Sequence, residues 1–93
     1  MIRNYQDRET EKVANGQRSR KLPADIQLKA FTKLAMIAAA SNPQDLQSPP
    51  GNRFHALDRD RKGQYSIAIN MQWRICFGWS DGGATDVEIT DYH

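Results

Sequence analysis

The chain has 93 residues, of which 39% are hydrophobic and 26% charged, and its formal net charge is +2. These values suit one globular domain spanning residues 1–93, and no stretch approaches the ~20 apolar residues of a membrane-spanning helix. Because there is no signal-peptide pattern and only one cysteine, Cys76, we expect a cytoplasmic protein with no internal disulfide and no membrane partner.

The first segments of the chain are rich in cations. Residues 2–5 suit a short edge strand, and the charged residues 7–15 suit a short helix. Residues 16–21 (GQRSRK) contain three cations and no apolar side chain, so they are predicted to form a mobile loop. This loop is either a solvated linker or an arm that binds phosphate.

A second, longer helix is predicted over residues 23–40. Pro23 suits the first turn of a helix, and residues 41–43 (SNP) end it. Its apolar stripe consists of Ala30, Leu34 and Ile37, flanked by Phe31 and Ala38. Lys29 and Lys33 fall outside this stripe. Residues 44–52 contain Pro-Pro-Gly and are predicted to be irregular.

In the second half of the chain the apolar period changes from 3.6 to 2, which is typical of strands. Two strands meet at a tight turn around residues 71–72, and a second turn at residues 80–83 leads into a last strand with Val87 and Ile89 facing inward. The alternating apolar residues of the first two strands are Tyr65, Ile67 and Ile69, then Trp73, Ile75, Phe77 and Trp79.

An earlier strand is predicted at residues 53–57. Phe54 and Leu57 have opposite parity there although both favour burial, a conflict that a bulge would reconcile.

The predicted fold class is therefore α+β, with two N-terminal helices packed on one face of an antiparallel β-sheet. The other face is predicted to carry polar and small residues, namely Arg74, Ser66, Asn70 and Cys76. Arg74 in the middle of a strand is either a phosphate ligand or a solvated cation.

The two histidines and Arg74 suggest cleavage of a phosphodiester. Tyr92 has the parity that places it on the face of Arg74, and His93 follows it, so the last strand is predicted to bring both beside the arginine. An imidazole can accept or donate a proton near neutral pH, and a guanidinium can hold two phosphate oxygens. When a ribose 2′-OH attacks the adjacent phosphate and cleaves the RNA chain, the reaction needs such a proton acceptor or donor and such a cation. The alternative is that His93 frays, His55 is a solvated strand residue and Tyr92 is an aromatic cap.

Other chemistries find less support in the sequence. There is no paired-histidine or Cys/His motif for a metal, no glycine-rich phosphate loop and no nucleophile elbow. Cys76 is predicted to be a packing residue within a strand. We therefore expect no metal and no cofactor.

Several segments of the chain resemble those of a known protein family. The opening MIR, the segments SPPGNRFHAL, GQYSIAIN and QWRICFGW, and the closing VEITDYH are similar to those of HigB-type toxins of bacterial toxin–antitoxin modules, in the RelE-like superfamily. The resemblance implies the RelE-like microbial RNase fold and a ribosome-dependent endoribonuclease that cuts translated mRNA in the A site. It also implies a helix-turn-helix antitoxin of the HigA type, through which the toxin contacts operator DNA indirectly.

The resemblance also assigns roles to residues. It implies that His55 and Arg74 are catalytic, together with the terminal Asp91, Tyr92 and His93. Where some relatives have a lysine, this chain has Asp58, a carboxylate that would repel phosphate. The cations implied to bind RNA are Arg53, Arg59, Arg61 and Lys62.

Two alternatives of other classes remain at this stage. One is a toxin that acts by binding a protein, as gyrase poisons do, without enzymatic activity. The other is a regulatory RNA-binding domain that is not toxic. The presence of both His55 and His93 favours the nuclease over these alternatives.

Overall fold

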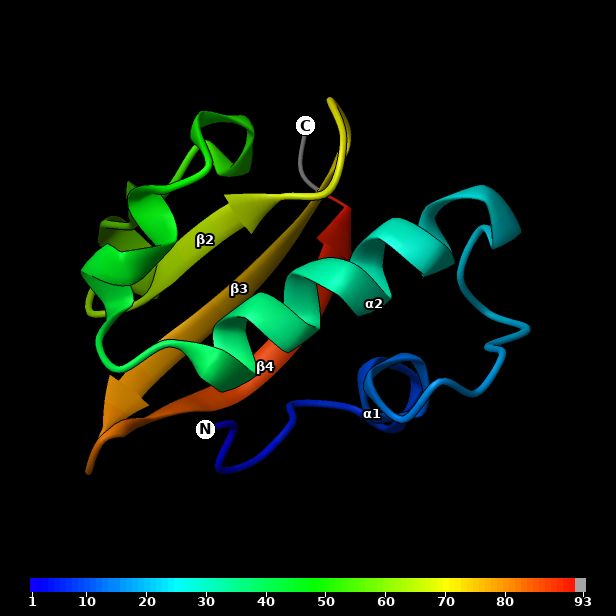
Figure 1. Cartoon of the computed structure of the whole chain (residues 1–93), viewed down its shortest axis with the longest axis horizontal. Helices are drawn as coiled ribbons and strands as arrows, with labels where there is room; N and C mark the ends of the chain where they lie inside the picture. Colours follow the sequence, from blue (N-terminus) through cyan, green and yellow to red (C-terminus); the bar gives the residue numbers. More distant parts are fainter. Residues whose placement is uncertain (92–93) are drawn as a thin grey trace.

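The computed structural model, which describes residues 1–91, has an α+β fold in which two helices cover one face of a four-stranded antiparallel sheet (Figure 1). This agrees with the predicted fold class. The helices are α1 (Arg8–Ala14) and α2 (Ala24–Ala39), and the strands, in sheet order, are β1 (His55–Ala56), β2 (Tyr65–Ala68), β3 (Trp73–Ser80) and β4 (Gly83–Asp91). No helix within the described residues has the length and apolar character needed to span a membrane.

The two hairpins form where the sequence predicts them. The turn between β3 and β4 places Asp81 and Gly82 at φ values of 51° and 78°, the left-handed geometry that suits two-residue hairpins. At the other hairpin, the Ile69 N–H donates to the Trp73 carbonyl at 2.8 Å. These turns fix the register that places Ala68 and Thr90 on either side of Arg74.

The N-terminal segment completes the edge of the sheet beside β4. Ile2 and Tyr5 form isolated parallel bridges with Ala84 and Val87, so the predicted edge strand pairs at two points and not as a continuous ladder. The side chain of Asn4 contacts Asp86, whose φ of 49° marks an irregular point of β4.

The core lies between α2 and the sheet. The predicted stripe of α2 is confirmed, since Ala30, Leu34 and Ile37 are buried against sheet residues, whereas Phe31 beside it is 41% exposed. The sheet residues of this core are Ile67, Ile69, Ile75, Phe77, Val87 and Ile89.

The position of Lys33 differs from the prediction that it lies outside the apolar side of α2. Its side chain is buried, and its Nζ donates to the Asn52 Oδ1. The amide of Asn52 in turn donates to the Leu46 and Ser48 carbonyls at 3.2 and 3.4 Å. The periodicity of apolar residues in a helix cannot predict a hydrogen bond to a residue so far along the chain.

The segment predicted to be irregular, residues 44–52, contains two short 3-10 helices, η1 (Pro43–Gln47) and η2 (Pro50–Asn52). In η1, Asn42 and Asp45 form a reciprocal capping box, and each of the two helices has a proline in its first turn. The prediction of wholly irregular structure was therefore wrong.

The strand predicted at residues 53–57 is reduced to the two residues of β1. Arg53 has a φ of 47°, which turns the chain directly before the strand. Leu57 follows the strand and is buried, while the ring of Phe54 stacks on Tyr65 with centroids 5.5 Å apart. The parity conflict is therefore resolved by the shortness of the strand.

Residues 16–21 are anchored in the structure, in contrast to the predicted mobile loop. Ser19 is buried, and its hydroxyl donates to the Glu9 carboxylate at 2.6 Å. Gln27 of α2 accepts from the Ser19 N–H and donates to the Ser19 carbonyl. The loop therefore connects α1 to α2 through specific hydrogen bonds.

Candidate functional site

Two adjoining hollows lie on the side of the sheet that faces away from α2. One has a volume of about 460 Å³ and is lined by Arg53, Phe54, His55, Leu57, Ser66, Met71 and Arg74. The other has a volume of about 450 Å³ and is lined by His55, Leu57, Asp58, Arg59, Asp60 and Arg61. Because His55 lines both, it stands where the two hollows meet.

Arg74 donates hydrogen bonds to neutral oxygen atoms of Ser66 and Arg53. Its Nε donates to the hydroxyl of Ser66 at 2.9 Å, and one terminal nitrogen donates to the Arg53 carbonyl at 2.7 Å. Ser66 is fully buried, and the left-handed backbone of Arg53 directs its carbonyl toward β3. These contacts hold the guanidinium without neutralising its charge.

The structure brings His55 to the same sheet face as Arg74. His55 of β1 is the cross-strand partner of Ser66, and Ala68, two residues farther along β2, is the partner of Arg74. Partners in an antiparallel sheet and residues two apart share a face. An exposed imidazole and an oriented guanidinium therefore line one hollow.

The end of β4 lies beside the beginning of β3. Asp91 pairs with Trp73, and its carboxylate accepts from the Gln72 side chain at 3.1 Å. Tyr92 and His93 lie outside the described residues, so their predicted approach to Arg74 stays a prediction.

The four cations predicted to bind RNA differ in their surroundings. Arg53 is exposed at the first hollow, Arg59 is exposed at the second, and Lys62 is exposed on the adjoining turn. Arg61 contacts Glu88 at 3.1 Å and Gln64 at 3.0 Å. The second hollow also contains Asp58 and Asp60, so its lining has carboxylates as well as cations.

The sheet face around Arg74 is more enclosed than the sequence suggests. Ser66 and Cys76 on this face are fully buried, and Arg61 reaches across to Glu88, the cross-strand partner of Cys76. Burial raises the pKa of the Cys76 thiol, which supports its interpretation as a packing residue.

Sequence reasoning placed Ser66 on this face without assigning it a role. Only the register of β2 against β3 shows that its hydroxyl reaches the guanidinium.

For metals, residues 1–91 bring together no group of three His, Cys, Asp or Glu side chains suited to holding an ion.

Comparisons with known proteins find similarity to HigB toxins. Residues 3–93 match the model of a family described as HigB-like toxin, the RelE-like toxin of the type II toxin–antitoxin system HigB. The chain is 42% identical over 72 residues to toxin HigB-1 of Vibrio cholerae, which covers 77% of this chain and 76% of that protein. It is also 39% identical over 41 residues to endoribonuclease HigB of Proteus vulgaris, covering 44% of this chain and 45% of the relative. A third relative, an uncharacterised protein of Haemophilus influenzae, is 33% identical over 69 residues, with 74% of this chain and 68% of the relative covered.

Proposed function

We propose a function from the premise that this chain belongs to the HigB-like toxins, the RelE-like toxins of type II toxin–antitoxin systems. It is the toxin of such a system, and it acts as an endoribonuclease, the activity named for its relative from Proteus vulgaris. The observation that carries this proposal is the hollow in which His55 accompanies an Arg74 already oriented by Ser66 and Arg53.

The proposed reaction is attack by a ribose 2′-OH on the adjacent phosphorus. A base removes the 2′-OH proton, the new O–P bond forms, and the P–O5′ bond breaks. The 5′-oxygen takes a proton from an acid, which leaves a 2′,3′-cyclic phosphate and a 5′-OH. In this scheme His93 or His55 is the base, and the other histidine or Tyr92 supplies the proton.

Arg74 has the electrostatic role in this scheme. Two nonbridging oxygens of the phosphate gain negative charge as the pentacovalent transition state forms, and a guanidinium can contact both. Because Ser66 and Arg53 already orient Arg74, little reorganisation is needed when RNA binds.

The charge distribution suggests where the RNA backbone lies. In the second hollow the carboxylates of Asp58 and Asp60 offset the arginines and repel phosphate, whereas the lining of the first contains Arg53 and Arg74 and no carboxylate. We therefore place the scissile phosphate in the first hollow, with Arg59 and Lys62 contacting the strand farther along.

The partners follow from the family and from this chemistry. Membership of a toxin–antitoxin family implies an antitoxin. We propose further that the antitoxin is a helix-turn-helix protein of the HigA type, that it links the toxin to operator DNA, and that the toxin acts in the cytoplasm on mRNA held by the 70S ribosome.

Primer extension on mRNA from cells that express the toxin tests this function. We expect new 5′ ends phased with the reading frame for the wild type, and about 10²-fold less cleavage for Arg74→Ala, since removal of one transition-state donor has an effect of this size. We expect His93→Ala to lower cleavage without lowering the melting temperature, since terminal residues contribute little to stability. Arg8→Ala, which removes an exposed arginine of α1, is the matched control.

The outcomes separate the alternatives. Wild-type cleavage without phasing, or in the absence of ribosomes, would contradict ribosome dependence alone. Toxicity that persists unchanged in both Arg74→Ala and His93→Ala would favour a toxin that acts by binding a protein. Absence of growth arrest on expression without the antitoxin would favour a regulatory RNA-binding domain.

A further inference from the structure

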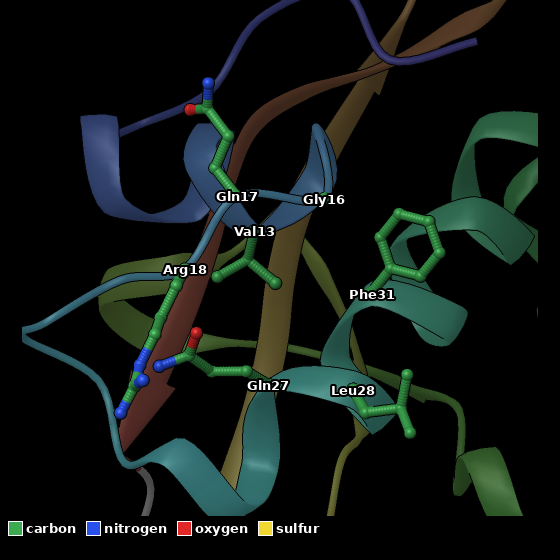
Figure 2. A pocket seen from close by; sticks show the side chains of 7 residues that line it. All are labelled: Val13, Gly16, Gln17, Arg18, Gln27, Leu28 and Phe31. Atoms are coloured by element: carbon green, nitrogen blue, oxygen red, sulfur yellow. The ribbon is translucent and has the colours of Figure 1, made fainter.

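The helical side of the molecule carries a groove that the proposed nuclease chemistry does not use. It has a volume of about 450 Å³ and runs between the end of α1, the segment that follows it, and α2. Figure 2 shows Val13 and Arg18 on one side of this groove and Leu28 and Phe31 of α2 on the other. We call it the α1–α2 groove.

Two apolar side chains of α2 in this groove are exposed, whereas Val13 of α1 is buried at its base. Leu28 is 79% exposed and Phe31 is 41% exposed, and their spacing of three residues puts them on one face of α2. A Cβ at Gly16 would lie 3.9 Å from the Phe31 ring, so bare backbone forms the opposite wall there. Exposed apolar surface inside a concavity is typical of a protein-binding site.

The groove is held in shape by hydrogen bonds. Gln27 binds both backbone groups of Ser19, and the Ser19 hydroxyl binds Glu9 of α1. The loop that carries Arg18 is therefore attached to both helices at Ser19, the residue that follows Arg18. A partner does not have to order this loop on binding, which favours affinity.

The rim of the groove is cationic. Arg18 lines the groove and also an adjoining hollow of about 530 Å³ that contains Arg20. Within residues 1–91, neither arginine has an ion-pair partner. The nearby carboxylate of Glu9 is occupied by Ser19 and by Lys12 at 3.6 Å. The rim therefore complements carboxylates on a partner.

We propose that the α1–α2 groove is the docking site for the cognate antitoxin. In this arrangement the antitoxin seats apolar side chains against Leu28 and Phe31 and directs neighbouring carboxylates toward Arg18 and Arg20. The inference rests on the proposed function only in taking the antitoxin as the partner. The exposed Leu28 and Phe31 side chains favour a protein over RNA, whose backbone would need phosphate contacts along the whole groove.

Affinity measurements test the docking site. The probe is the purified helix-turn-helix protein encoded beside the toxin gene, and its Kd for the folded full-length chain is measured by calorimetry. We expect Leu28→Glu to raise the Kd about 30-fold or more, because it places a charge at a central apolar contact. We expect Arg18→Glu to raise the Kd about tenfold, with a smaller effect at high salt, because charge pairs at a rim are screened.

Met71→Glu is the matched control. Met71 is 86% exposed and lines the first hollow, not the α1–α2 groove, so this variant serves as a control for antitoxin affinity alone and tests whether any new carboxylate on exposed apolar surface has the same effect. Its Kd is expected to equal that of the wild type. Melting temperatures of all three variants verify that the chain is folded.

The possible results are distinct. Wild-type affinity for both Leu28→Glu and Arg18→Glu would overturn the proposal, as would a wild-type chain that does not bind the probe. Normal antitoxin affinity with weakened ribosome binding in these variants would overturn it in favour of an RNA contact. RNA cleavage by the wild-type chain is measured separately, so failure of the nuclease proposal is recognised independently of antitoxin binding.

Discussion

Ser66 illustrates how one buried hydroxyl can determine the geometry of a charged group. It has no exposed surface, and its oxygen accepts from Arg74 in the centre of the sheet. The parity of β2 and β3 predicted that these residues share a face. It could not predict the hydrogen bond, because that depends on the register, in which Ser66 lies opposite Cys76 and not opposite Arg74.

We expect Ser66→Ala to lower the kcat of RNA cleavage about tenfold with little change in KM, because loss of one hydrogen bond loosens the guanidinium without removing its charge. Single-turnover cleavage of a defined mRNA on ribosomes measures this effect. A positioning role also predicts that the pH profile of cleavage keeps its shape. Ser66→Ala cleaving as fast as the wild type would show that the Ser66 hydroxyl is not needed to position the guanidinium.

Lys33 is the second residue whose environment differs from the pattern of the sequence. Burial is the main reason that its pKa lies below the ordinary 10.5, and the charge of Lys29 adds to this effect. The amine is tolerated inside because the Asn52 Oδ1 accepts a hydrogen bond from it. The Asn52 amide also donates to the carbonyls of Leu46 in η1 and of Ser48 directly after η1.

This environment predicts a pH dependence of stability. The folded chain holds the Lys33 proton less tightly than the unfolded chain, so the free energy of unfolding rises as pH increases from the folded pKa toward 10.5. Below the folded pKa the cost of burying the charge is present in full. Urea unfolding at a series of pH values should show this rise in the wild type and not in Lys33→Met. Lys62→Met, which removes an exposed lysine, should keep it.

At the scale of elements, the sequence predicted the helices and strands that form from patterns of neighbouring residues. Alternation of apolar residues located β2, β3 and β4, and the positions of proline and of the apolar stripe located α2. The remaining elements depend on contacts between distant residues. The bond from Ser19 to Glu9 orders the basic loop, and Lys33 binds the end of η2 through Asn52.

The attachment of the N-terminal segment to β4 gives a prediction at this scale. A Cβ on Gly83 would lie 2.9 Å from the Met1 carbonyl oxygen, which already accepts from the Ala84 N–H at 2.8 Å. We therefore expect Gly83→Ala to lower the free energy of unfolding by about 1–3 kcal/mol, the usual cost of overpacking. Thermal or urea unfolding measures it.

Gly51→Ala is the control for this substitution, because a Cβ there meets no atom within 4 Å. Its stability should equal or slightly exceed that of the wild type, since alanine restricts the unfolded chain. If the two alanine variants were equally stable, the contact between the N-terminal segment and Gly83 would contribute nothing to folding.

At the scale of the whole molecule, the sheet separates two surfaces of different character. Arg74 and His55 line a hollow on one side. The helices α1 and α2 cover the other side (Figure 1), and the groove beside Leu28 lies between them (Figure 2). Sequence patterning predicted two different faces. It could not locate the groove, because Phe31 was assigned to the flank of a buried stripe and proved exposed.

This separation predicts that the two surfaces act independently. Leu28→Glu should weaken antitoxin binding and leave RNA cleavage unchanged, whereas Arg74→Ala should lower cleavage and leave antitoxin affinity unchanged. The double variant should match Leu28→Glu in antitoxin affinity and Arg74→Ala in cleavage, as expected for distant sites with no shared partner. Cleavage rates and Kd values for the four proteins of this cycle measure it. A coupling free energy above about 0.5 kcal/mol would show instead that the sheet transmits a change between its two sides, because additivity at independent sites holds to about that value.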